Sequence, residues 1–231
     1  EDSQHRTSNV LMLYPIDLVS VDERFGSWMV QYGYADFITA EKLCELGRVT
    51  ATGDIAVKDR RYRTLVALYE PFPSEQLMFL MERLVNQGGR VVWSGTPPFL
   101  HAEGTPVRHA WERLFGVTCG HEDAPTGVPV PGRTIRFCGP LDGVPAQIIL
   151  TNTVVDHIYP FVVSGGSEVS AKVGKWVVGA IRSAGTRGGK AVALGFRPRD
   201  DQSQSLGDEV RTWFEILVKL GSYPPSGSFG D

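Results

Sequence analysis

Short apolar runs alternate along this chain with longer segments whose apolar residues recur at helical spacing. Three of the runs are NVLMLYP (9–15), RTLVALYEP (63–71) and RVVWSG (90–95). A continuous apolar run of this length is typical of a strand that is buried on both faces of a parallel sheet. The pattern therefore predicts three such strands in the N-terminal half of the chain.

Helical spacing appears in the segments that follow the strands. Segment 20–34 starts with capping-box spacing and then carries the apolar stripe Phe25, Trp28, Met29 and Tyr32. Segments 74–89 and 205–221 carry similar stripes, and 39–46 predicts a shorter helix that ends at a glycine. Strands that alternate with helices imply right-handed βαβ units and a parallel sheet.

The pattern changes from about residue 105. A short helix is predicted over 108–116, and a segment rich in proline and glycine follows it. Two strands of an excursion, which could form a hairpin, are predicted over 133–139 and 146–152. Further on, the runs 176–185 and 190–196 predict two strands that are joined by a turn.

These elements predict one α/β domain over residues 9–221, a three-layer sandwich with a mostly parallel central sheet. The region 105–170 is expected to be a β-rich insertion in the second half of that domain. Residues 1–8 are polar and residues 222–231 are turn-rich, so both ends are expected to be flexible. A length of 231 residues suits one large domain of this kind.

The composition is that of an ordinary globular protein, with 42% hydrophobic and 21% charged residues. Its formal net charge of -3 gives no basic excess that would point to nucleic acid or an anionic membrane as a partner. No apolar run approaches the roughly 20 residues that span a bilayer. The polar start lacks a signal-peptide core, which slightly favours the cytoplasm. The compartment stays unknown, because a module cut from a longer chain would look the same.

The cysteines and histidines do not predict a metal site or any cofactor. Three cysteines are present, none in C-x-x-C spacing, which indicates reduced thiols rather than a disulfide framework. Several residues that could ligate a metal fall within a short stretch: His101, His109, Cys119, His121 and Glu122. Structural zinc sites usually take their ligands in close pairs, and most spacings here are too loose for that.

Polar residues follow several of the predicted strands. Ligands of open α/β sheets bind beyond the carboxyl ends of the strands, so these turns are the places to expect a site. A small-molecule enzyme or binder would require convergence of six residues there: Asp17, Asp22, Ser94, Thr96, Arg197 and Arg199. Arg197 and Arg199 could bind a carboxylate or phosphate, although pairing with the neighbouring aspartates is favoured.

The turn after the run 90–95 offers Ser94 and Thr96 as hydroxyl nucleophiles. A nucleophile elbow of the G-x-S-x-G kind needs glycines two residues before and two residues after the serine. Val92 and Thr96 occupy those places, so a plain glycine turn is favoured. Of the aromatic residues, Tyr34 and Trp93 lie off the helical stripe and are predicted to be exposed for contact with a ligand or partner.

A resemblance to a known family joins these elements. Segment YRTLVALYEPFPSEQLMFLMERLVNQGGRVVWSG (62–95) resembles the strand, helix and strand before the elbow of class I glutamine-amidotransferase-like, flavodoxin-like domains. Segment 189–217 is similar to their closing strand and helix. The family includes versions appended to bacterial glycoside hydrolases, such as the trimerisation domain of some β-galactosidases.

The resemblance implies a role without catalysis. Active amidotransferases carry a glycine-flanked cysteine at the elbow and an H-x-E pair near the end of the domain. Here Ser94–Thr96 contains no cysteine, and the one H-x-E pair, His101 with Glu103, comes too early. The first hypothesis is therefore a module of a larger carbohydrate-active bacterial protein that contacts a neighbouring domain or forms a homo-oligomer. The second is the enzyme or binder that uses the strand-end crevice.

Overall fold

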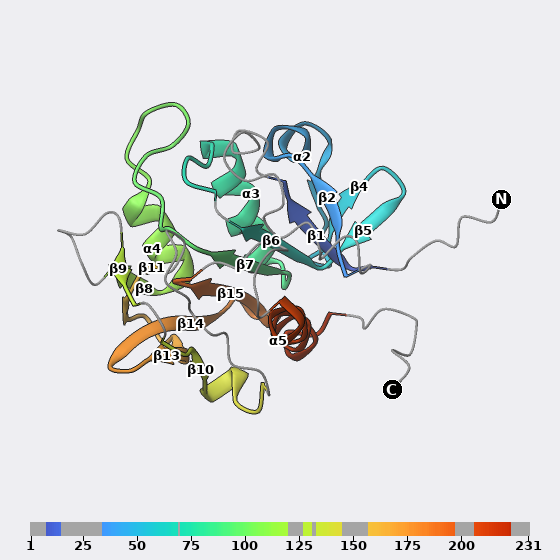
Figure 1. Ribbon diagram of the computed structural model, residues 1–231. Helices are drawn as coiled ribbons and strands as arrows, with labels where there is room; N and C mark the ends of the chain where they lie inside the picture. The colour runs from blue at the N-terminus through green and yellow to red at the C-terminus, as the bar shows by residue number, and fades with distance from the viewer. Residues whose placement is uncertain are drawn as a thin grey trace, which may run out of the picture.

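A computed structural model describes residues 8–14, 34–68, 70–119, 127–130, 133–144, 157–196 and 206–222 (Figure 1). The helix predicted over 20–34 and the strand predicted over 146–152 lie outside these residues. The predictions for the flexible ends fall almost wholly outside them as well.

The described fold is built around one sheet of eight strands, in the order β10-β13-β14-β15-β7-β6-β1-β2. Five neighbouring strands run parallel: β2 (Asp36–Ile38), β1 (Val10–Leu13), β6 (Thr64–Leu68), β7 (Arg90–Ser94) and β15 (Gly189–Leu194). The remaining three pair antiparallel: β14 (Trp176–Ala184), β13 (Glu168–Val173) and β10 (Arg136–Phe137).

The α/β class and the parallel strands of the first half are as predicted, but the sheet is mixed rather than mostly parallel. The turn 185–188 between β14 and β15 is the reason, because so short a connection can join only antiparallel strands. The strand predicted over 133–139 is present as β10, and it pairs with β13 at the sheet edge. Sequence periodicity alone does not report such a partner.

Helices cover both faces of this sheet. Along β1, Val10 and Met12 point into one apolar core, whereas Leu11 and Leu13 point into the other. The first core is closed by α5 (Leu206–Lys219), and the second by α2 (Ala40–Leu46), α3 (Glu75–Asn86) and α4 (Arg108–Phe115). Figure 1 shows α5 and α3 on opposite sides of the strands. No described helix is long and apolar enough to cross a membrane.

The helices begin and end where their flanking residues predict. The Ser74 hydroxyl accepts a hydrogen bond from the backbone N–H of Leu77 at 3.1 Å and caps α3. Thr39 caps α2 in the same way. Gly116 ends α4 with a left-handed φ of 64°, a conformation that costs glycine little.

Three small sheets and a short 3-10 helix, η2 (Gly139–Leu141), complete the described fold. The small sheets pair β3 (Arg48–Val49) with β4 (Ile55–Val57) and β5 (Arg60–Tyr62), β8 (Val117–Cys119) with β12 (Phe161–Val163), and β9 (Val128–Pro129) with β11 (His157–Ile158). At the edge strand β2, the Asp36 carboxylate accepts hydrogen bonds from Arg60 at 2.7 Å and from the Tyr62 hydroxyl at 2.8 Å. Strand β5 is therefore anchored to the sheet edge.

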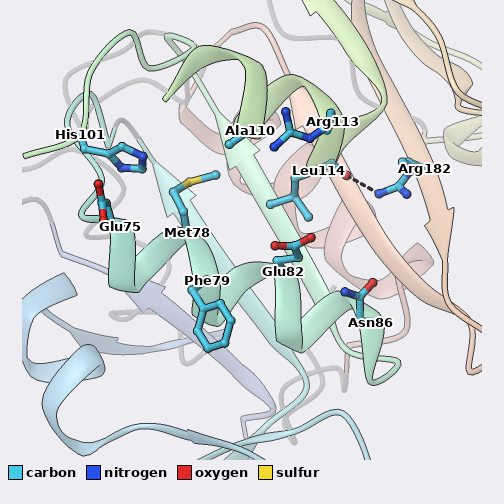
Figure 2. A pocket seen from close by; sticks show the side chains of 10 residues that line it. All are labelled: Glu75, Met78, Phe79, Glu82, Asn86, His101, Ala110, Arg113, Leu114 and Arg182. Carbon is cyan, nitrogen blue, oxygen red and sulfur yellow. Dashed lines mark hydrogen bonds between the residues drawn. The ribbon is translucent and has the colours of Figure 1, made fainter. Parts of the chain in front are cut away.

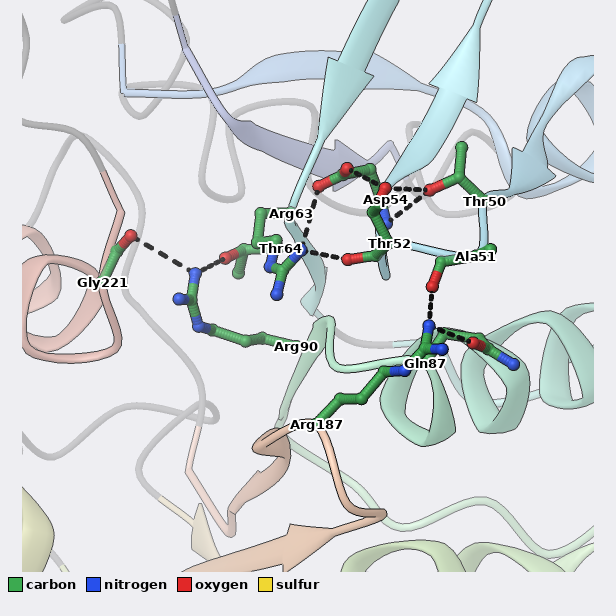
Figure 3. A network of polar contacts seen from close by, with 10 residues as sticks. All are labelled: Thr50, Ala51, Thr52, Asp54, Arg63, Thr64, Gln87, Arg90, Arg187 and Gly221. Carbon is green, nitrogen blue, oxygen red and sulfur yellow. Dashed lines mark hydrogen bonds and ion pairs between the residues drawn. The ribbon is translucent and has the colours of Figure 1, made fainter.

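A polar network fixes the amino ends of the parallel strands (Figure 3). Arg187, in the β14–β15 turn, donates to the Ala51 carbonyl and to the Gln87 side chain, so three distant turns meet. Arg63 donates to the Thr52 carbonyl in the same region. Both carbonyl acceptors belong to a turn, where backbone groups have no partner in a sheet. The two guanidinium groups supply the hydrogen bonds that these carbonyls would otherwise lack.

Gly53 lies where the β3–β4 turn meets the end of α3. Its φ is 79°, and an added Cβ would lie 2.4 Å from the Gln87 carbonyl oxygen. Gly104 has a similar φ of 84°, but nothing lies within 4 Å of an added Cβ. A comparison of alanine substitutions at the two positions therefore separates the cost of backbone strain from the cost of a steric clash.

We expect Gly53→Ala to lower the free energy of unfolding by about 3 kcal/mol, because backbone strain of ~1–2 kcal/mol adds to overpacking of ~1–3 kcal/mol. Gly104→Ala carries the strain alone and should lose only ~1–2 kcal/mol. Urea denaturation of both variants measures the difference. Equal losses would show that the close approach at Gly53 does not matter.

Candidate functional site

The turn after β7 does not present its serine to solvent. Ser94 is fully buried, and its hydroxyl donates a hydrogen bond to the carbonyl of Phe196, two residues past the end of β15. The backbone N–H of Gly95 donates to the Leu194 carbonyl at 2.9 Å, with Gly95 at a φ of 102°. Both contacts tie the turn to β15, so the Ser94 oxygen acts here as a structural donor.

The two aromatic residues predicted to be exposed are buried, and that prediction is wrong. Trp93 has no exposed surface, and Tyr34 is 6% exposed. The Trp93 indole packs edge-on against Trp111 of α4, with ring centroids 5.8 Å apart, and its N–H donates to the Thr96 carbonyl at 3.0 Å. Tyr34 packs against Phe214 of α5 at 4.6 Å. Helices cover both rings, which a local pattern does not reveal.

Four members of the predicted crevice lie outside the described residues: Asp17, Asp22, Arg197 and Arg199. Their convergence with Ser94 and Thr96 therefore stays a prediction.

The order of the strands favours a different place for a ligand crevice. From β1 the chain continues to β2 on one side of it, and β6 then lies on its other side, and ligands bind at such a switch point between strands. That point lies at the strand ends near Tyr14 and Glu70, one strand away from Ser94.

The H-x-E pair helps to hold a loop against the start of α3. The His101 Nδ1 lies 3.0 Å from the Pro73 carbonyl oxygen, and the ring is 9% exposed. The Glu103 carboxylate accepts a hydrogen bond from the backbone N–H of Glu75 at 3.4 Å. Thr105 donates to the Glu75 carboxylate at 2.9 Å. These contacts attach the loop 99–106 to the start of α3.

A groove of about 440 Å³ lies between α3 and α4 (Figure 2). Met78 and Leu114 are among its apolar residues, and Glu82 of α3 and Arg113 of α4 lie along it on the two helices. The Arg182 guanidinium, also in the lining, donates to the Leu114 carbonyl at 3.0 Å. Sequence reasoning missed this groove, since it assigned 74–89 and 108–116 to helices without predicting that they pack together.

The described residues contain no group of three metal-ligating side chains. His101 contacts the Pro73 carbonyl, and His109 lies 3.3 Å from the Glu112 carboxylate. Burial raises the pKa of the Cys119 thiol to about 12, which keeps it protonated at neutral pH. A protonated thiol is a poor zinc ligand. His121 and Glu122 lie outside the described residues.

Neither a protein-family model nor a curated protein matches the sequence. Solved structures share its fold. Gan42B, a GH42 β-galactosidase from G. stearothermophilus, superposes with a TM-score of 0.61 at 16% identity, over 94% of this chain and 30% of its own. The β-galactosidase from Bacillus circulans sp. alkalophilus gives 0.60 at 13% identity, over 95% and 32%.

The fold also occurs in a much shorter chain. The cytoplasmic protein STM3548 from Salmonella typhimurium matches with a TM-score of 0.54 at 14% identity, over 85% of both chains. Identities this low show a shared fold only. The chain thus has the fold of a segment that makes up about 30% of GH42 β-galactosidases, and it spans less than a third of Gan42B.

We expect Ser94→Ala to lower the free energy of unfolding by about 1–3 kcal/mol, because it removes the donor to the buried Phe196 carbonyl. Urea denaturation measures the loss. Ser183→Ala is a matched control, since Ser183 is exposed on β14 and should change stability by less than ~0.5 kcal/mol. Equal stability of the two variants would contradict the structural role of the Ser94 hydroxyl.

We expect Cys119 to react slowly with iodoacetamide at pH 8, because the thiolate is the reactive form and its formation is suppressed by burial. Peptide mass spectrometry should show labelling roughly 1,000-fold slower than in the same chain unfolded in urea. Similar rates in both states would show that the thiol is accessible and ionises normally.

Proposed function

We propose that this chain is a non-catalytic module of a larger carbohydrate-active bacterial protein, and that it contacts a neighbouring domain or forms a homo-oligomer. The observation that carries the proposal is the shared fold, which covers 94% of this chain but 30% of a GH42 β-galactosidase. A segment that accounts for less than a third of an enzyme leaves most of that enzyme to other parts of the chain. The comparison supports a role beside a catalytic domain.

We also propose the finer assignment to the amidotransferase-like, flavodoxin-like domains. In chain order, the five parallel strands are arranged 2-1-3-4-5, which is the flavodoxin-like order. In the amidotransferase-like reading, the turn after β7 is the elbow that would carry the nucleophile. Ser94 there is buried and bonded to Phe196, which supports a module whose elbow has a structural use.

Exposed apolar side chains support a role in association. Phe72 and Phe79 are 59% and 60% exposed, although both are large aromatic residues. Such side chains are costly to leave in water and are enriched where proteins contact one another. Their position on and beside α3 favours the surface of this helix as the one that takes part in association.

The proposal predicts no turnover of glutamine or of 4-nitrophenyl β-galactoside by the purified chain. The rates should equal those of a Ser94→Ala variant, which keeps the turn but lacks its hydroxyl. Turnover that disappears in this variant would contradict a non-catalytic role and favour the crevice enzyme. Spectrophotometric and ammonia-release assays measure both reactions.

Association is measured by light scattering on this chain and on a longer chain that carries it. We expect the longer chain to assemble, and its assembly to fail when residues 9–221 are deleted. Unchanged assembly after the deletion would contradict the proposed role, whatever the isolated chain does.

A further inference from the structure

Large apolar residues are exposed in segments that contact one another, and we call the surface of these segments the α3 face. It comprises the exposed residues of the α2 end, of α3 with the loop before it, and of the loop after β7: Leu46, Phe72, Phe79, Phe99 and Leu100. Two hydrogen bonds join these segments, from the Gln76 side chain to the Cys44 carbonyl at 3.0 Å and from the Ala102 N–H to the Pro73 carbonyl at 3.2 Å. Within the described chain, one other large apolar residue is exposed, Val162 of β12.

The groove between α3 and α4 opens on this face. Phe79 lines it, and its ring is 60% exposed although Met78, beside it, is buried. The Arg83 guanidinium lies 5.9 Å from the ring centroid, so a positive charge lies beside the exposed ring. The groove volume of about 440 Å³ is ample for an aromatic side chain. The same face therefore carries a projecting ring and a recess that can receive one.

The two helices of the groove carry opposite charges. Glu82 is exposed on α3 and Arg113 is exposed on α4, and neither makes a hydrogen bond or ion pair within the described residues. Other charged groups of the lining are already engaged, since Glu75 accepts from Thr105 and Arg182 donates to Leu114. Glu82 and Arg113 thus remain available to groups from outside.

We infer that a second copy of this chain occupies the groove, across a two-fold axis. The inference rests on the proposed function and names its partner and surface. In a two-fold contact both copies use the same surface. If one residue of the first copy contacts a second residue of the other copy, the reverse contact is also made. Phe79 of each copy enters the groove of the other beside Met78 and Leu114, and Glu82 of each copy faces Arg113 of the other. One surface supplies both the ring and its recess, and both signs of charge.

Sedimentation equilibrium over a concentration series of the 231-residue chain tests this. We expect a monomer–dimer equilibrium, and Phe79→Ser should raise the dimer Kd about 30-fold or more, as for a buried aromatic anchor. Val162→Ser is the matched control, because Val162 is equally exposed, at 60%, but lies off the α3 face. It should leave the Kd unchanged.

Exchanging the charges of Glu82 and Arg113 tests whether these two residues contact each other between the copies. Glu82→Arg and Arg113→Glu should each weaken the dimer about tenfold by placing like charges together, and the double variant should restore wild-type association. All three positions are exposed, and thermal melts by circular dichroism check that every variant folds.

A chain that stays monomeric at every concentration overturns the inference but leaves the proposed function standing, since the module can instead contact a neighbouring domain of a longer chain. A dimer that neither Phe79→Ser nor the charge exchange weakens also overturns it. Glutamine or galactoside turnover would instead overturn the proposed function.

Discussion

Burial of the parallel strands on both faces is the constraint on which the rest of this structure depends. Neighbouring residues of one strand point to opposite cores, as Val92 and Trp93 do in β7. Each core needs its own cover, because apolar surface left in water costs about 25 cal/mol per Å². Helix α5, from the end of the chain, closes one face, and α2, α3 and α4 close the other. Strand β1 and helix α5, which are far apart in the sequence, are therefore part of one fold.

The same burial determines which groups at the strand ends are accessible to solvent. At the carboxyl end of β7, Trp93 and Ser94 are drawn into the interior and bonded to neighbouring backbone. At the amino ends, the side chains of Arg63 and Arg187 donate hydrogen bonds to backbone carbonyls of a neighbouring turn. On the outer side of the molecule, α3 exposes polar residues and the aromatic ring of Phe79 to solvent.

The accessory role proposed above is consistent with this distribution of buried and exposed groups. The fold recurs as a minor part of GH42 β-galactosidases and as most of the Salmonella protein STM3548, so it serves in chains of different lengths. The burial of Ser94 at the end of β7 and the exposure of Phe72 and Phe79 support that proposal. The groove between α3 and α4 is the surface that we propose for this contact.

The sequence by itself determined the local elements: the strands at β1, β6 and β7, the caps at Thr39 and Ser74, and the β14–β15 hairpin. These follow from periodicity, capping and turn residues, which act over a few positions. Only the tertiary structure decided that β13 and β10 extend the antiparallel half of the sheet, that Trp93 and Tyr34 are covered, and that α3 and α4 form a groove. Strand partners and burial depend on residues far apart in the chain, and local pattern carries no record of them.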